Sequence, residues 1–289
     1  MRRSRPGRAR RRGRAMDRRG RAPGKTTRSP RPPRPRGLSF ACLGTSGAVP
    51  SGARDTTAVV VSAGDTTCLV DVGGSPVQKL RRVGIDPVKL SAVVVTHTHP
   101  DHVYGLPALV QCLLILGRRM PLPIYCRAEH ADVLRRLLDL FGLADEGLSV
   151  PVVPVEPRQG VRVLETPGLV LTASPNAHGL MPNLAIRADA AGRSLVYSSD
   201  TRPCAEVEAL ARGATVLIHE ATFARPDPTQ WHSTAREAGQ VARAAGVRRL
   251  YLAHVGYAVH GRLQSHLAAA RVGFGGAVAM AEELRWYPV

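Results

Sequence analysis

Aromatic side chains are scarce in this sequence, since Phe, Trp and Tyr make up only 4% of its 289 residues. A hydrophobic core must therefore rest on aliphatic residues, which are plentiful because 44% of the chain is apolar. Long apolar runs are also lacking. The best candidate, residues 106–116, contains Gln111 and is shorter than the roughly 20 residues that a membrane-spanning helix needs. We expect a globular protein of one large or two small domains, without a membrane span.

The cysteines show no pairing pattern. There are five of them, and none forms a C-x-x-C pair: Cys42, Cys68, Cys112, Cys126 and Cys204. An odd number without framework spacing is typical of a reducing compartment, so we expect a cytoplasmic protein without disulfides. The same spacing argues against cysteine as a metal ligand.

Acidic residues do not balance the basic ones, and the formal net charge is +18. The excess lies in residues 1–36, which hold sixteen basic residues and one acid, whereas the remainder carries only +3. A segment of Arg, Pro, Gly, Ala and Ser cannot bury enough apolar surface to fold, so we expect residues 1–37 to be disordered. Three interpretations compete: an RNA-contacting arm, a solvated tail without a role, or a start assigned upstream of Met16 or Leu38. A secretory signal is not expected, because no apolar stretch follows the charges.

From about Leu38 onward, β-rich and helical patterns alternate, and the second half roughly repeats the first. The apolar run 88–96 is interpreted as one strand buried on both faces. The other predicted strands are 38–43, 57–63, 66–72, 150–155, 161–164, 169–174, 194–198, 214–218 and 249–253. The predicted helices are 105–116, 129–141, 205–211, 234–245 with Ser233 as N-cap, and 263–270. This mixture predicts one α/β domain over residues 38–289, with two packed sheets and helices outside.

The strongest motif is the H-x-H-x-D-H sequence of residues 97–102, directly after the predicted strand 88–96. His97 and His99 lie two apart on extended chain, so they point the same way and can grip one metal ion. Asp101 and His102 lie where the chain turns into the next helix, and they can hold a second ion. These donors suit Zn²⁺, with Mn²⁺ or Fe²⁺ as alternatives. The competing interpretation is a surface histidine cluster with capping residues.

Two metal ions need more donors than this motif supplies. Three further candidates each follow a predicted strand, where loops carry functional sites: His178, Asp200 and His254. Alone, each histidine would be an ordinary structural residue, and Asp200 would be a helix or turn cap. In company with the first motif, all three are predicted metal ligands.

This order of donors resembles the ligand order of the metallo-β-lactamase superfamily. Other motifs are similar to its ribonuclease Z branch: the glycine-rich loop 43–50, Gly-Leu-Pro at 105–107, His-Glu-Ala-Thr-Phe at 219–223 and His-Ser-Thr at 232–234. The resemblance runs from about Leu38 to the last residue. It implies an αββα sandwich of two packed mixed sheets flanked by helices, and a hydrolase that cleaves phosphodiester bonds.

The resemblance also implies a role for each site residue. It assigns one zinc ion to His97, His99 and His178, a second to Asp101, His102 and His254, and the bridge between them to Asp200. A water between the ions, deprotonated near neutral pH and oriented by Asp101, would attack the phosphorus. Glu220 would keep His232 protonated, so that His232 donates a proton to the departing ribose oxygen. Without such a role, Glu220 makes an ordinary buried hydrogen bond and His232 only precedes a helix.

Several departures from ribonuclease Z leave the substrate open. His178 and Asp200 are only 22 positions apart, too few for the extended arm with which the transfer-RNA-processing members grip their substrate. Gly-Gly-Ser-Pro-Val at 73–77 replaces Gly-Glu-Gly-Thr-Gln, and Val-Gly replaces Phe-Ser after His254. A net charge of +3 outside the tail is also modest for an RNA-binding protein.

Three functions therefore stay open. The first is a zinc phosphodiesterase acting on RNA 3′ ends or a small cyclic nucleotide. The second is a thioester, lactone or ester hydrolase of the same fold, and the third is a non-catalytic RNA-binding protein led by its basic tail. The full donor set disfavours the third, and the motifs around Glu220 and His232 favour the first. Family members often form homodimers, but the sequence shows no interface. The remaining histidines are predicted to be structural: His130, His219, His260 and His266.

Overall fold

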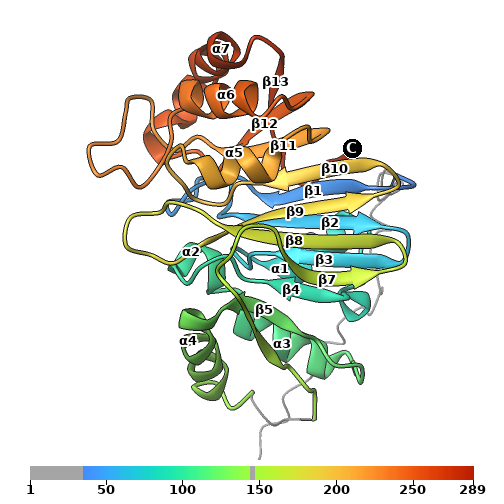
Figure 1. Ribbon diagram of the computed structural model, residues 1–289. Coiled ribbons are helices and arrows are strands. Elements are labelled where there is room, and N and C mark those ends of the chain that lie inside the picture. The colour runs from blue at the N-terminus through green and yellow to red at the C-terminus, as the bar shows by residue number, and fades with distance from the viewer. Residues whose placement is uncertain (1–34, 144–146) are drawn as a thin grey trace, which may run out of the picture. The chain divides into compact units, whose positions relative to one another are not determined.

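The computed structural model describes residues 35–143 and 147–289. The predicted tail, 1–37, lies outside the described residues except for 35–37. The described chain contains two seven-stranded mixed sheets, which lie between two groups of helices in Figure 1. In the described part of the chain, no helix has the length and apolar character needed to cross a membrane.

The first sheet has the strand order β14-β1-β2-β3-β4-β5-β6. Neighbours are antiparallel from β14 to β3 and parallel from β3 to β6. Its strands are β1 (Ser39–Gly44), β2 (Ala58–Ala63), β3 (Thr66–Val70), β4 (Ala92–Val94), β5 (Ile124–Arg127), β6 (Val152–Val155) and β14 (Trp286–Pro288).

The second sheet has the order β13-β12-β11-β10-β9-β8-β7. It is antiparallel from β7 to β10 and parallel from β10 to β13. Its strands are β7 (Val161–Thr166), β8 (Leu169–Pro175), β9 (Leu184–Ala190), β10 (Arg193–Tyr197), β11 (Val216–Glu220), β12 (Arg249–Ala253) and β13 (Ala277–Met280). The carboxyl ends of β8, β10, β11 and β12 therefore face the same edge of the sheet.

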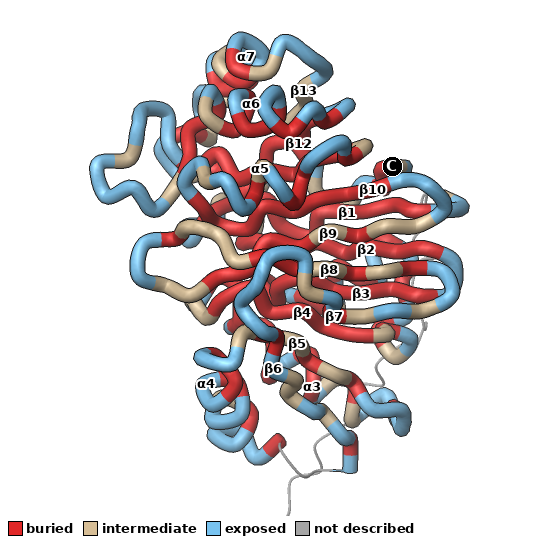
Figure 2. The backbone as a smooth tube through the Cα atoms, in the orientation of Figure 1, coloured by how far each residue is buried: buried red, intermediate tan, exposed pale blue. Residues whose placement is uncertain are grey.

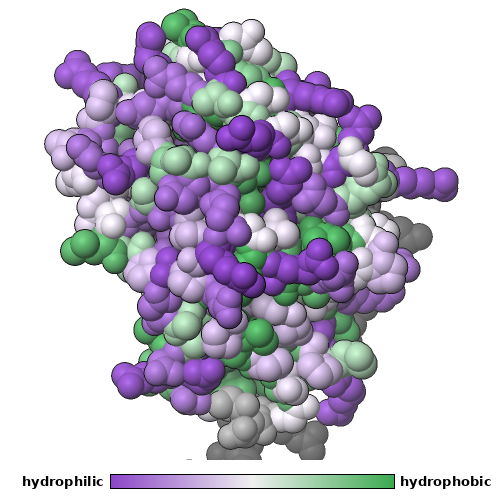
Figure 3. Space-filling model, viewed as in Figure 1, coloured by the Kyte–Doolittle hydropathy of each residue, from purple (hydrophilic) through white to green (hydrophobic). Residues whose placement is uncertain are grey.

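Buried side chains, mostly aliphatic, fill three layers, and Figure 2 shows most strands buried over much of their length. The central layer, between the sheets, includes Phe40, whose ring contacts Tyr251 and Tyr287 at centroid distances of 5.2 and 5.0 Å. On the face drawn in Figure 3, hydrophilic side chains are interspersed with hydrophobic ones.

Helices cover the outer face of each sheet. The first sheet carries α1 (Pro76–Arg82), α2 (Pro100–Val103), α3 (Leu106–Ile115) and α4 (Ala128–Asp139). The second carries α5 (Ala205–Ala211), α6 (Ala235–Ala244) and α7 (Leu263–Phe274). Two short 3₁₀ helices, η1 (Pro87–Lys89) and η2 (Tyr257–Arg262), complete the described elements. The predicted αββα sandwich is confirmed.

The single strand predicted over 88–96 is wrong in its first part. Pro87 and the Asp86 carboxylate, which accepts a hydrogen bond from the Val88 amide at 3.1 Å, start η1 instead. The Arg118 guanidinium then binds the carbonyls of Val88 and Leu90 at 2.7 and 2.8 Å, so these carbonyls do not join the sheet. Only β4 pairs as a strand.

The predicted N-cap of α6 is also wrong. Thr234 caps the helix, because its hydroxyl accepts from the Glu237 amide while the Glu237 carboxylate accepts from the Thr234 amide. Ser233 is engaged elsewhere, since its hydroxyl donates to the Thr201 carbonyl at 2.7 Å. Eight elements were not predicted: α1, η1, α2, β5, β9, η2, β13 and β14.

Candidate metal centre

The seven predicted metal ligands meet at one place, although they come from both sheets. The loop after β4 and helix α2 supply four of them, and the loops after β8, β10 and β12 supply the others. Six of the seven are buried, and His99 is half-buried: His97, His99, Asp101, His102, His178, Asp200 and His254.

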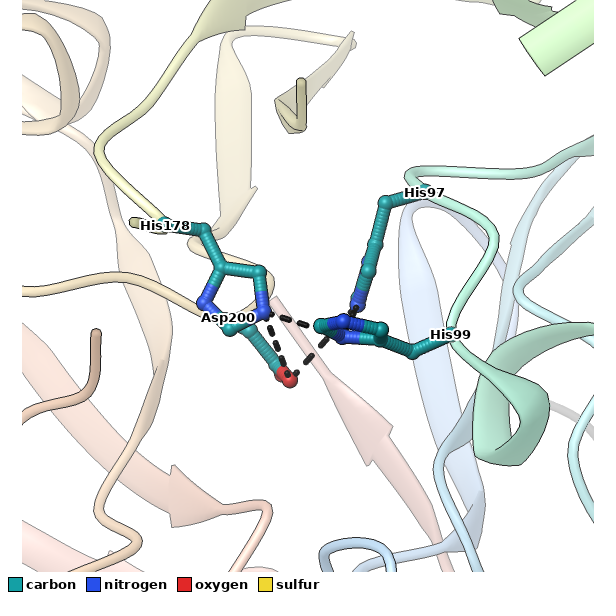
Figure 4. Close-up of side chains that lie close together, drawn as sticks. All are labelled: His97, His99, His178 and Asp200. Atoms are coloured by element: carbon teal, nitrogen blue, oxygen red, sulfur yellow. Dashed lines mark hydrogen bonds and ion pairs between the residues drawn. The ribbon is translucent and has the colours of Figure 1, made fainter. Parts of the chain in front are cut away.

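Four of these side chains form a first group, drawn in Figure 4. Nδ1 of His99 lies 3.0 Å from Nε2 of His97 and 3.1 Å from Nε2 of His178. Oδ2 of Asp200 lies 3.8 Å from Nε2 of His97 and 3.9 Å from Nε2 of His178. Three imidazole nitrogens and one carboxylate oxygen thus surround a single point.

The second group contains Asp101, His102 and His254. Oδ2 of Asp101 lies 3.5 Å from Nε2 of His102 and 3.4 Å from Nε2 of His254. Oδ2 of Asp200 lies 3.4 and 3.1 Å from the same two nitrogens. The Asp200 carboxylate therefore borders both groups, as the sequence analysis expects of a bridging ligand.

The hydrogen-bond partners of the ring nitrogens indicate which atoms are left to bind a cation. Nδ1 of His102 donates to the Asp71 carboxylate at 2.8 Å, and Nδ1 of His178 donates to the Trp231 carbonyl at 3.0 Å. Nδ1 of His97 faces the Thr96 hydroxyl, and Nδ1 of His254 faces the Thr222 hydroxyl. Each hydroxyl donates its own proton to a carboxylate, so it accepts a hydrogen bond from the histidine. Each Nε2 then turns a lone pair inward. Among the described residues, Nε2 of His102 and Oδ1 of Asp200 are buried without a hydrogen-bond partner.

The pKa shifts of three histidines agree with this donor arrangement, and that of His102 does not. Burial would lower the pKa of His102, but the Asp200 and Asp71 carboxylates outweigh it and hold that pKa well above its usual range, so a cation bound there would have to displace the His102 proton. Burial lowers the pKa of His97, His99 and His178, which keeps them neutral. Burial alone would raise the pKa of Asp200, but the charges of His254 and His102 outweigh it and hold the carboxyl well below its usual range. Neutral imidazoles and ionised carboxylates are the forms that bind divalent zinc, so the residues fit a metal site.

Asp71 supports this centre, and the sequence analysis missed it. It follows β3, is fully buried, and adopts a left-handed backbone with φ of 60°. Its carboxylate accepts from the Thr96 amide and hydroxyl at 2.9 Å as well as from His102. The signal that could have revealed it is a carboxylate at a strand end, next to the strand that precedes the H-x-H-x-D-H motif.

We expect Asp71→Asn to weaken metal binding by about 10–100-fold, the usual cost of losing a carboxylate partner of a metal-binding histidine. An amide NH₂ facing His102 would favour the tautomer that places its proton on Nε2, toward the cluster. Metal titration against a competing chelator measures the effect. Asp189→Asn, at a half-exposed carboxylate that pairs with Arg187, is the matched control. Equal affinity in both variants would contradict this role for Asp71.

A carboxylate and a histidine adjoin the donors, as the sequence analysis expects. Oε1 of Glu220, at the end of β11, accepts from Nδ1 of His232 at 2.8 Å. Glu220 is fully buried and also accepts from the Thr201 amide and the Thr222 hydroxyl. Burial would lower the pKa of His232, but the hydrogen bond and charge of Glu220 outweigh it and raise that pKa to about 9. The His232 ring lies 4.8 Å from that of His178, between centroids.

The glycine-rich loop lies directly against His254. A Cβ at Gly47 would stand 3.1 Å from Cε1 of His254, so this position favours glycine. The loop is held by Glu283, whose carboxylate accepts from the amides of Thr45 and Asp55 at 3.0 and 2.8 Å. The glycine-rich loop therefore packs against the ring of His254, one of the candidate metal ligands.

Asp200 and His254 also form a third group with His232, so His232 itself lies close enough to join a metal site. The four histidines predicted to be structural lie outside all three groups of the described residues. Each has a backbone carbonyl as a hydrogen-bond partner: Pro182 for His130, Glu220 for His219, Val255 for His260 and Ala221 for His266. The 21 residues between His178 and Asp200 contain β9 and β10, and they form no arm.

Known proteins resemble this chain in sequence and in fold. The beta-lactamase superfamily domain matches residues 66–255. A ribonuclease Z of Methanosarcina mazei is 32% identical over 268 residues, covering 75% of this chain and 87% of the relative. The metallo-beta-lactamase fold protein YhfI of Bacillus subtilis is 25% identical with a TM-score of 0.73, over 86% of this chain and 98% of that one. The short form of human tRNase Z shares the fold, with 22% identity and a TM-score of 0.68 over 87% and 99% of the two chains.

The matched region includes the whole H-x-H-x-D-H motif and the three later donors, so family and site coincide on the same residues. A fold of this kind with a buried His/Asp cluster is that of a metal-dependent hydrolase. The chain belongs to the metallo-β-lactamase superfamily, in its ribonuclease Z-like branch.

Proposed function

We propose that this chain is a dinuclear zinc phosphodiesterase of ribonuclease Z type that cleaves RNA. The proposal extends the family assignment to the number of ions, the bond cleaved and the substrate. The donor groups of the metal centre would hold the two ions, with Asp200 between them. Ions held there supply a nucleophilic water at neutral pH and stabilise negative charge on a phosphate.

One observation carries the choice of phosphodiester over other bonds. His232 lies beside the donor cluster and is hydrogen-bonded to the buried Glu220 carboxylate. Because its pKa is raised to about 9, His232 is protonated at neutral pH and can give a proton away. A ribose alkoxide leaves poorly without a proton, whereas a thiolate leaves readily. An acid in this position therefore suits ribose-linked phosphodiesters best.

Other residues have supporting roles. The Asp101 carboxylate, which lies near both His102 and His254, would orient the attacking water. Thr222 donates to Glu220 at 2.7 Å and accepts from His254 at 2.9 Å, so it links the acid pair to the donor cluster. The buried positions of these groups limit the access of bulk water and strengthen their interactions.

RNA is the proposed substrate because curated relatives at about 30% identity are ribonucleases Z. The segment between His178 and Asp200 has no arm, so the chain must contact RNA through other surfaces. A short 3′ end therefore suits this site better than recognition of a whole transfer RNA.

A substrate panel on zinc-loaded protein tests the proposal. It contains bis(p-nitrophenyl) phosphate, cyclic AMP, a precursor transfer RNA, a short oligoribonucleotide and an acyl thioester. We expect turnover of the chromogen and the oligoribonucleotide. Thioester turnover without any phosphodiester cleavage would overturn the proposal, and cleavage of cyclic AMP alone would replace RNA with a small nucleotide.

A further inference from the structure

Two partly exposed aromatic side chains adjoin the donor cluster, in a protein that has few aromatics. Trp231 and Phe223 are 36% and 39% exposed. Their rings contact successive histidines: Trp231 to His178 at 5.7 Å, His178 to His232 at 4.8 Å and His232 to Phe223 at 5.7 Å between centroids. The aromatics thus stand at the two ends of a row of rings that includes the proposed acid.

The position of Trp231 is fixed by its surroundings. The Asp227 carboxylate accepts from the amides of Trp231 and His232 at 2.8 and 3.2 Å, which shapes the loop that carries the indole. Gly179 makes room for the indole, because a Cβ there would lie 2.4 Å from its Cε2 atom, and φ of +56° also favours glycine. The indole is also nearly parallel to the His99 ring, at 9° and 6.3 Å.

Part of the Trp231 side chain is not covered by the rest of the protein. About a third of the residue is exposed, and its indole N–H has no hydrogen-bond partner among the described residues. Partly exposed aromatic rings beside a centre that would bind phosphate are suited to binding nucleobases by stacking, largely independently of sequence. The chemistry of the surface therefore points to a base-bearing substrate.

We propose that Trp231, together with Phe223, is a stacking surface for the bases of the nucleotides next to the scissile phosphate. The proposal rests on the proposed phosphodiesterase function and adds to it a determinant of substrate class. Substrates with a base next to the phosphate gain affinity from this surface, and sugar phosphates do not. Because every base has an aromatic face, the preference is for nucleotides in general.

Tryptophan fluorescence tests stacking directly, since the chain has only two tryptophans and the other, Trp286, is 7% exposed. The full-length protein is titrated with AMP and, in parallel, with ribose 5-phosphate, with and without added zinc. We expect AMP to quench the emission and ribose 5-phosphate to leave it unchanged. The AMP response should vanish in Trp231→Phe. Equal responses to both ligands, or quenching that persists in Trp231→Phe, would overturn the proposal.

Kinetics on a dinucleotide provide the second readout. Trp231→Ala should raise KM by about 5- to 100-fold, the range expected for one base–aromatic stack, with kcat changed much less. Trp231→Phe should restore most of the affinity, because it keeps a ring. Metal content should stay unchanged, because His178 binds the backbone carbonyl of Trp231 and not its side chain.

Phe141→Ala is the matched control, at an aromatic residue that is 60% exposed and has no ring contact with the cluster histidines. A KM that rises as much in Phe141→Ala as in Trp231→Ala would overturn the proposal. AMP quenching without cleavage of any phosphodiester would support the stacking surface and overturn the proposed enzymatic function. Phosphodiester cleavage with an unchanged KM in Trp231→Ala would support the proposed enzymatic function and overturn the stacking surface.

Discussion

Replacing Asp200 with Ala is expected to remove most bound metal and to lower phosphodiester turnover by more than about 100-fold. This loss is larger than the one usual for replacing a residue that only hydrogen-bonds a metal ligand, which is about 10–100-fold. The Asp200 carboxylate is 2% exposed and borders both donor groups, within 3.1 Å of His254 and 3.8 Å of His97. Without it, one group keeps only neutral imidazoles and the other keeps a single carboxylate. Elemental analysis of the purified variant and a turnover assay at saturating zinc measure the two effects.

Asp189→Ala is the control, because it also removes a carboxylate but from a half-exposed pair with Arg187 on β9. It should keep both metal and activity. Circular dichroism in the presence of a chelator checks that the Asp200 variant is folded. Two ions retained by folded Asp200→Ala would refute the bridging role.

His232→Ala should lower kcat by about 10²–10⁴-fold on an oligoribonucleotide, the usual size of general-acid catalysis. The loss should be small on bis(p-nitrophenyl) phosphate, because nitrophenolate departs without a proton. Metal content should be unchanged. Equal losses on both substrates with metal retained would mean that His232 positions the substrate instead. Lost metal would mean that His232 is a ligand, a geometry that its place near Asp200 and His254 allows.

The pH profile gives an independent check on this acid. The pKa of His232 is raised to about 9 by Glu220, so the protonated form dominates at neutral pH and is lost as pH rises through about 9. Oligoribonucleotide cleavage should fall in that range, while cleavage of the nitrophenyl ester should not. In Glu220→Gln burial still lowers the pKa while the largest opposing influence is gone, so the fall should move to lower pH. An alkaline limb at the same pH in both proteins would contradict the pairing.

The donor residues could be predicted from the sequence because their signals are local. The motif places four candidate donors within the six residues 97–102. The other three candidates each follow a strand, so only that strand has to be recognised to find them. The predicted α5 and β12 match the structure in both boundaries. Short-range patterns of this kind do not depend on what the neighbouring strands are.

The supporting residues were not predicted, because their roles arise from tertiary pairing and the local signals are weak. Asp71 reaches Thr96 and His102 only because β3 lies beside β4. The Trp231 carbonyl meets His178 across 53 residues of sequence. β14 has three residues and exists as a strand only through its pairing with β1, so its own sequence carries almost no signal. The run 88–96 looked continuous because the carbonyl contacts of Arg118 are invisible in a linear pattern.

Because Glu283 holds the glycine-rich loop, the site can be completed only late in the synthesis of the chain. Thr45 and Glu283 are 238 residues apart, so at roughly 5–20 residues per second the loop waits about 10–50 s on the ribosome for its partner. During that time β1 also lacks β14 and presents an unpaired edge, which is a hazard for aggregation. The H-x-H-x-D-H motif is translated early. The glycine-rich loop beside His254, however, can be held by Glu283 only after residues 283–288 have emerged. Nascent chains therefore carry four of the seven candidate donors long before they carry a complete site.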